Sequence, residues 1–240
     1  MENRDVLLKG TGTQSAQLEY VFHNAEEPTF NGYIATDPKT KVIAVVFRGS
    51  STTDDLETVL DVKRDSWPVG TGSEIYGGPL SGYQTHGAAL VAEHQKLVTK
   101  YPDYRSVITG HSLGGLHAMI YAFDNYGKLG PAPWEVITFA SPKIGNPEFR
   151  QLWRAKDIPV ARVANLNDAA IHWPLLSYSF CHTGPPIVID SESNQTYACA
   201  DESTPGSPNA CLTQKRKMRA SLSAHGSFWG NDGSQFGPKA

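Results

Sequence analysis

Apolar runs recur along the chain and predict the strands of one sheet. Residues 42–47 (VIAVVF) are continuously apolar and mostly β-branched, which is typical of a strand covered on both faces. Shorter runs of similar character predict four further strands, at 106–109, 136–139, 160–163 and 187–190.

Helical periodicity appears between these runs. Apolar residues share one face over 83–101, where Pro102 ends the predicted helix. A second set at i, i+3, i+4 and i+7 starts at Leu116 and predicts a helix directly after Ser112. The alternation predicts an α/β fold with a central, mostly parallel sheet flanked by helices. We expect residues 1–240 to form a single domain, with a flexible tail at about 231–240.

A serine lies where the predicted strand at 106–109 turns into the second helix. Gly110-His111-Ser112-Leu113-Gly114 has the form G-x-S-x-G, in which glycines make room for a strained turn that presents the serine hydroxyl. The start of the helix favours negative charge, so the N–H of Leu113 could stabilise an oxyanion. The alternative is a glycine-rich turn whose serine caps the helix. The strand-to-helix context favours a nucleophile at Ser112.

A nucleophilic serine needs a histidine base and a carboxylate that orients it. In this fold class both follow the serine in the chain. His225, between small residues in a late loop, is favoured over His182, while His117 and His172 are poorly placed. Asp168 follows the predicted strand at 160–163, at the strand end where α/β active sites collect. Asp157 precedes that strand, and Asp190 is the reserve candidate.

Four motifs in order extend this interpretation: VVFRGS, TGHSLGG, TFASPKIGN and NLNDAAIHWP. Together they resemble the fungal lipases of the class 3 family, a branch of the α/β-hydrolases that also contains feruloyl esterases. The resemblance runs from about residue 18 to 230. It implies that Ser112, Asp168 and His225 form a catalytic triad and that His182 is structural. It also implies that Ser50, at the end of FRGS, completes the oxyanion hole with Leu113.

The segment after FRGS corresponds to the lid of these lipases, about residues 51–66 here. A short helix is predicted, with an apolar stripe of Leu56, Val59 and Leu60. The stripe could cover Ser112 or turn outward to meet lipid, or it could simply pack on the core. The chain departs from the family at 75–79 (IYGGP), where a V-H-x-G-F element is usual.

Charge and cysteines change the picture only slightly. A net charge of −3 gives no general attraction to nucleic acid, and no apolar run is long enough for a transmembrane helix. No signal peptide is recognisable at the start. Cys199 and Cys211 flank a polar loop that a disulfide could close, which would leave Cys181 as a buried thiol. We therefore favour a secreted protein, with a cytoplasmic location left open.

The sequence thus predicts a serine carboxylic ester hydrolase that needs no metal or organic cofactor. Its expected substrate is a lipid or other ester, with triacylglycerol at an oil–water interface favoured. A feruloyl-type esterase acting on soluble aryl esters is the first alternative. A binding protein on an inactive hydrolase scaffold is the second, and the oligomeric state is left open.

Overall fold

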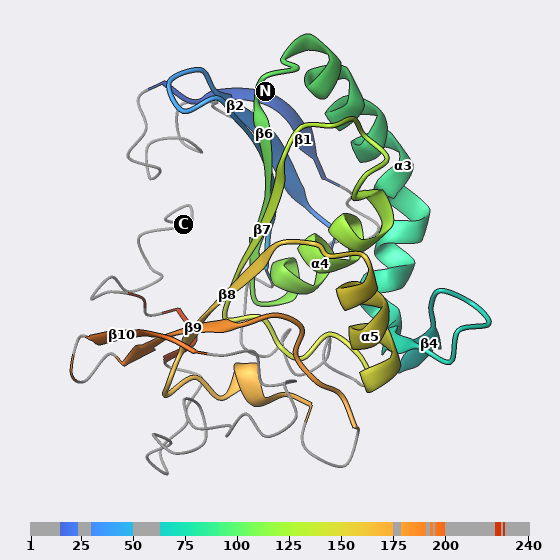
Figure 1. The fold of residues 1–240 in the computed structure, drawn as a ribbon, viewed down its shortest axis with the longest axis vertical. Helices are drawn as coiled ribbons and strands as arrows, with labels where there is room; N and C mark the ends of the chain where they lie inside the picture. The colour runs from blue at the N-terminus through green and yellow to red at the C-terminus, as the bar shows by residue number, and fades with distance from the viewer. Residues whose placement is uncertain are drawn as a thin grey trace.

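The fold is built on one twisted sheet, shown in Figure 1. The computed structural model describes residues 15–23, 30–49, 63–174, 179–190, 193, 195–199, 224–226 and 228. Within these residues an eight-stranded sheet has the order β1-β2-β3-β6-β7-β8-β9-β10. The strands are β1 Gln17–Phe22, β2 Gly32–Asp37, β3 Val42–Phe47, β6 Arg105–His111, β7 Trp134–Phe139, β8 Val160–Asn165, β9 Pro186–Asp190 and β10 Gln195–Ala198.

The middle of the sheet is parallel. Strands β3, β6, β7, β8 and β9 pair in parallel, while β1, β2 and β10 extend the two ends as antiparallel strands. Parallel neighbours end at the same edge, so the residues that follow β3, β6 and β8 are brought to one side of the molecule. The predicted α/β fold with a mostly parallel sheet is confirmed.

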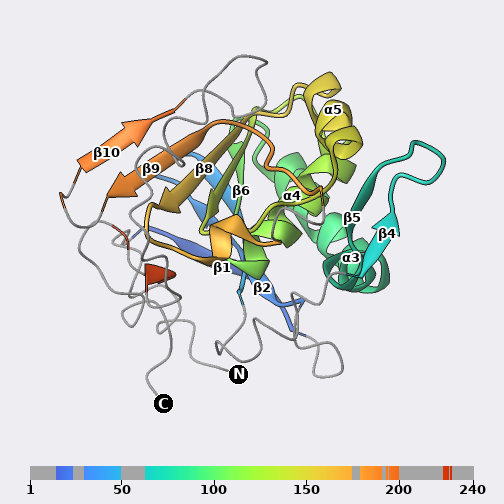
Figure 2. The same ribbon diagram turned by 90° about the horizontal axis from the view of Figure 1, so that it is seen from below.

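Three described α-helices lie together on one face of the sheet (Figures 1 and 2). They are α3 Gly77–Lys100, α4 Leu113–Asn125 and α5 Pro147–Ala155. Their buried faces and the strands enclose the larger apolar core, in which α4 is buried along almost its whole length. A second, smaller apolar cluster contains Val163, Leu166, Val188 and Phe228. The loop near residue 225 is attached to the sheet through this second cluster.

All five predicted strands are present, and both predicted helices form. Helix α3 begins at Gly77, six residues before the predicted start. The prediction missed these six residues because Gly77-Gly78-Pro79 is typical of a turn, although proline is tolerated in the first turn of a helix. The short 3₁₀ helix η1 (Ala170–His172) follows β8.

The predicted lid lies mostly outside the described residues, which resume at residue 63. Its last part, Arg64–Ser66, is strand β4, which pairs with β5 (Glu74–Tyr76) in a hairpin beside α3 (Figure 2). The predicted tail at 231–240 also lies outside the described residues. Within the described part of the chain, no helix combines the length and the apolar character needed to cross a membrane.

Candidate active site

Ser112 occupies the turn between β6 and α4 in a strained backbone conformation. Its φ of 57° and ψ of −124° lie in a region that residues with a side chain rarely adopt. The surroundings hold this turn in place: the N–H of Ser112 donates to the carbonyl of Phe139 at 2.8 Å, and its carbonyl accepts the N–H of Gly115 at 2.9 Å. The predicted strand–serine–helix turn is therefore present.

Two glycines leave the space that this turn requires. A Cβ on Gly110 would lie 2.2 Å from the carbonyl oxygen of Gly114, and one on Gly114 would lie 2.3 Å from the carbonyl oxygen of Phe47. Both obstacles are backbone atoms, which cannot move aside as a side chain could. The glycines of G-x-S-x-G thus allow β3, β6 and α4 to approach closely at one point.

The loop after β3 packs against the serine turn. A Cβ on Gly49 would lie 2.7 Å from the carbonyl oxygen of His111 and 3.4 Å from the Cβ of Ser112. The FRGS motif therefore reaches the nucleophile candidate, although Ser50 itself lies outside the described residues. Leu113 is the first residue of α4, so its N–H has no acceptor within the helix.

Asp168 and His225 come together although 57 residues separate them. Nδ1 of His225 donates to Oδ2 of Asp168 at 2.8 Å, and Oδ1 of Asp168 accepts the N–H of Ala170 at 2.8 Å. The Asp168 side chain is 0% exposed and that of His225 is 12% exposed. Because Nδ1 carries the proton in this hydrogen bond, Nε2 of neutral His225 keeps a free lone pair.

His225 also lies against the residue that precedes Ser112. The ring centroids of His111 and His225 are 4.7 Å apart, and Nε2 of His111 is 2.7 Å from the carbonyl oxygen of His225. Oγ of Ser112 and Nε2 of His225 are both buried, and neither has a hydrogen-bond partner among the described residues. An acceptor nitrogen and a hydroxyl that both lack a partner are thus held on neighbouring segments.

The competing histidines lie in other parts of the fold. Nε2 of His182 donates to the carbonyl of Ile171 at 2.7 Å, and burial holds the pKa of His182 well below its usual value. His117 is fully buried against the rings of Phe30 and Phe47, and burial lowers its pKa to about 3. His172 lies in the short helix η1.

The competing carboxylates also lie away from the His225 ring. Asp157 precedes β8, at the opposite end of that strand from Asp168. Asp190, at the end of β9, accepts hydrogen bonds from the side chain and the N–H of Ser193. Of the three carboxylates weighed from the sequence, Asp168 is the one that bonds to His225.

Two contacts of the site were not anticipated from the sequence, those of His111 and Phe228. Phe228 packs edge-on against both His111 and Phe139, and so joins the His225 segment to the sheet. A histidine directly before the serine was visible in the motif, but nothing in the sequence indicated what it contacts.

Three predicted lid residues, Leu56, Val59 and Leu60, lie outside the described residues. Cys199 is disulfide-bonded, whereas Cys211, its predicted partner, lies outside the described residues. Cys181 forms no disulfide, as expected, but it is half-buried where the sequence predicted a buried thiol, and its Sγ lies 3.4 Å from the carbonyl oxygen of Gly145.

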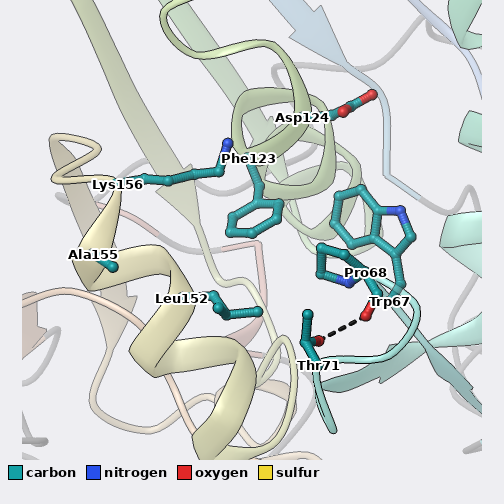
Figure 3. Close-up of a pocket in the computed structure, with 8 residues that line it drawn as sticks. All are labelled: Trp67, Pro68, Thr71, Phe123, Asp124, Leu152, Ala155 and Lys156. Atoms are coloured by element: carbon teal, nitrogen blue, oxygen red, sulfur yellow. Dashed lines mark hydrogen bonds between the residues drawn. The ribbon is translucent and has the colours of Figure 1, made fainter.

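A pocket of about 350 Å³ lies at the other end of α4 from Ser112 (Figure 3). Phe123 and Asp124, in the last turns of the helix, line it together with Trp67 and Pro68 of the loop between β4 and β5, and the rings of Phe123 and Trp67 pack edge to face at 5.1 Å. Leu152 of α5 completes the lining on a third side. Because α4 has 13 residues and rises about 1.5 Å per residue, this pocket is separate from the serine turn.

Comparison with known proteins agrees with this geometry. The sequence profile of the family described as Lipase (class 3) matches residues 44–178. The chain belongs to the class 3 lipase family. The match includes Ser112 and Asp168 and ends before His225, so the placement of His225 rests on the hydrogen bond to Asp168.

Individual members of the class 3 lipase family are similar over most of this chain. A lipase of Rhizopus niveus is 30% identical over 175 residues, which is 72% of this chain and 45% of the relative. The secreted mono- and diacylglycerol lipase A of Penicillium cyclopium is 29% identical over 192 residues, 78% of this chain and 60% of the relative. The chain thus spans about half the length of the curated relatives it matches.

The solved structure of the Rhizomucor miehei triacylglyceride lipase superposes with a TM-score of 0.82. It is 26% identical in sequence, and the superposition covers 94% of this chain and 84% of that one. The α/β-hydrolase fold predicted from the motifs is therefore confirmed.

Proposed function

We propose that this protein is a serine carboxylic ester hydrolase, with Ser112 as nucleophile, His225 as general base and Asp168 as the residue that orients the base. The observation that carries the proposal is the hydrogen bond from Nδ1 of His225 to a fully buried Asp168, beside a serine in a strained strand-to-helix turn. This is the arrangement that nucleophilic acyl transfer requires.

The reaction follows from the protonation states. Oγ of Ser112 attacks the ester carbonyl while its proton moves to Nε2 of His225, and Asp168 stabilises the resulting imidazolium. The tetrahedral oxyanion accepts hydrogen bonds from the N–H of Leu113 and from the N–H and hydroxyl of Ser50. The proton on His225 then goes to the departing alcohol, and water releases the acyl group by the same steps in reverse. Each oxyanion donor is expected to lower the barrier by about 3–4 kcal/mol.

We infer a fatty acyl ester as the substrate, with triacylglycerol favoured. Relatives named lipase, mono- and diacylglycerol lipase and triacylglyceride lipase support this substrate class. Ser112 is only 2% exposed, so atoms that cover it must move before an ester can reach it. This supports a lid at about 51–66 whose residues Leu56, Val59 and Leu60 turn toward lipid at an oil–water interface.

An extracellular location is part of the same proposal. Disulfides persist in oxidising compartments, and Cys199 is disulfide-bonded. A relative described as a secreted mono- and diacylglycerol lipase supports this location.

The deciding experiment replaces the nucleophile. The Ser112→Ala variant should keep the wild-type melting temperature and lose about 10⁶-fold in kcat, because a triad without its nucleophile retains only the oxyanion hole and binding. A p-nitrophenyl phosphonate should label Ser112 of the wild-type protein and leave the variant unlabelled. A variant that kept most of its esterase rate would overturn the assignment.

A substrate comparison tests the acyl class. We expect faster turnover of an emulsified long-chain triglyceride than of methyl ferulate. The reverse order would indicate a feruloyl-type esterase with the same triad.

A further inference from the structure

The side chain of His111 makes a directed contact with the backbone of the proposed base. Its Nε2 lies 2.7 Å from the carbonyl oxygen of His225, across a sequence separation of 114 residues. A carbonyl oxygen can only accept, so Nε2 of His111 must carry the proton and donate it. His111 therefore contacts the proposed base without sharing its proton relay.

Packing around His111 is also directional. Its ring lies 4.7 Å from the His225 ring, and Phe228 packs edge-on against it at 6.0 Å. Phe228 in turn packs edge-on against Phe139 at the end of β7. The described part of the His225 segment is thus fixed at the side chain by Asp168, at the backbone by His111 and beyond it by Phe228.

The charge state of His111 suits a permanent donor. Burial, followed by repulsion from His225, lowers the pKa of His111 to about 4, although the His225 carbonyl and the carboxylate of Asp168 both oppose the shift. His111 thus stays neutral at pH values where a general base must be neutral. It adds no positive charge beside the imidazolium that forms on His225 during the reaction.

We propose that His111 is a positioning residue, whose Nε2–H holds the backbone of His225 so that Nε2 of His225 can reach Oγ of Ser112. This inference rests on the proposed function and goes beyond the triad and the oxyanion hole. The hydrogen bond from Nδ1 of His225 to Asp168 sets the orientation of the imidazole ring. The hydrogen bond from His111 to the His225 carbonyl is needed to set the position of the ring relative to Ser112. Misplacement of a catalytic group by about 1 Å can cost about 100-fold in rate.

Three variants separate the hydrogen bond from the packing. His111→Gln places an amide N–H at about the reach of Nε2, and His111→Asn carries the same amide one methylene too short. His111→Leu removes the donor and retains a side chain of similar bulk that can still pack against Phe228. His86→Leu, at a half-buried position on α3, is the matched control for loss of an imidazole.

The readouts are kcat and KM on soluble p-nitrophenyl butyrate, together with the melting temperature. We expect His111→Asn and His111→Leu to lower kcat by about 10- to 100-fold with KM within threefold of wild type. His111→Gln and His86→Leu should stay within about threefold in both. If His111→Leu fails to fold, the Gln and Asn pair still decides, because the two differ only in reach.

Two outcomes overturn the inference: wild-type kcat in the Asn variant, or Gln and Asn variants that are equally slow. The rate of phosphonate labelling of Ser112 keeps this result apart from the proposed function. A wild-type protein that is not labelled refutes the triad itself. Rapid wild-type labelling with an equal rate in His111→Asn refutes only the role of His111.

Discussion

At the residue scale, the carboxylate of Asp168 selects the tautomer of the base. One oxygen accepts the backbone N–H of Ala170 and the other accepts Nδ1–H of His225. Both acceptors are used, and the carboxylate is 0% exposed. A side chain with only one oxygen cannot serve both donors.

Asp168→Asn therefore tests the tautomer directly. Its single oxygen should stay with the N–H of Ala170, which turns the amide NH₂ toward Nδ1 of His225 and moves the imidazole proton to Nε2. His225 could then no longer accept the proton of Ser112, and we expect kcat to fall by about 10⁴-fold with a small change in KM. Steady-state kinetics on a soluble ester measures both constants.

Asp190→Asn is the matched control, because it makes the same change at Asp190, the other carboxylate that the sequence left as a candidate for the triad. It should stay within about twofold of wild-type kcat. A loss confined to Asp190→Asn would mean that the carboxylates had been assigned the wrong way round.

At the element scale, the start of α5 ties the helix to the β4–β5 hairpin. Oδ1 of Asn146 accepts the N–H of Phe149 in the first turn of α5 and the N–H of Glu74 in β5, both at 3.0 Å. Its Nδ2 donates to the carbonyl of Gly72 at 3.0 Å. One buried amide therefore caps the helix and ties it to the hairpin.

Asn146→Ala should lower the free energy of unfolding by about 2–3 kcal/mol, from a lost cap of about 1 kcal/mol and two further hydrogen bonds of about 1 kcal/mol each. Asn146→Ser keeps a capping hydroxyl and loses the donor to Gly72 without adding a charge, so it should be the milder change. Urea denaturation measures both. Because Asn146 takes no part in the proposed chemistry, kcat should stay within twofold, and a large loss of kcat in folded enzyme would contradict the separation of the two regions.

Helix α5 also shows that short elements are harder to predict from the sequence than the central strands. The central strands were predictable because a strand buried on both faces must be apolar throughout. The start signals of α5 were present in the sequence as Asn146, Pro147 and Glu148. These signals alone do not predict a helix, because a nine-residue helix offers only two and a half turns of periodicity, and the short strands β4 and β5 offer none.

At the scale of the whole molecule, the site is assembled from segments that only the fold brings together. Ser112 was predictable because its turn has a local steric requirement, and Asp168 because it follows a strand at the active edge. The contact of His111 with His225 has no local signal, since it depends on how a loop more than 100 residues away packs on the sheet. The sequence therefore indicated the reacting groups better than the contacts that hold them.

The same burial that builds the core makes stability depend on pH. His94 is buried between Tyr121 and Ser106, to which its two ring nitrogens are hydrogen-bonded at 2.8 and 2.9 Å. Burial lowers its pKa to about 4, and burial also lowers the pKa of His117 to about 3. In the unfolded chain these histidines bind protons below about pH 6.5. Below that pH the unfolded state therefore holds more protons than the native state, and stability decreases as the pH falls toward 4.

His94→Gln tests this linkage, because glutamine does not titrate. A single histidine whose pKa is about 6.5 in the unfolded chain and about 4 in the native state, as for His94, loses stabilising effect as the pH falls. Between pH 7 and pH 5 it should lower the free energy of unfolding of the wild-type protein by about 2 kcal/mol. The variant should be less stable than wild type at pH 7, having lost a well-fitted ring, yet the difference between the two proteins should shrink by about that amount at pH 5. Urea denaturation at both pH values measures it, with His86→Gln on the same helix as the control for removing a half-buried imidazole. Parallel losses of stability in wild type and His94→Gln would show that His94 takes up its proton in the folded protein as readily as in the unfolded chain, against the burial seen here.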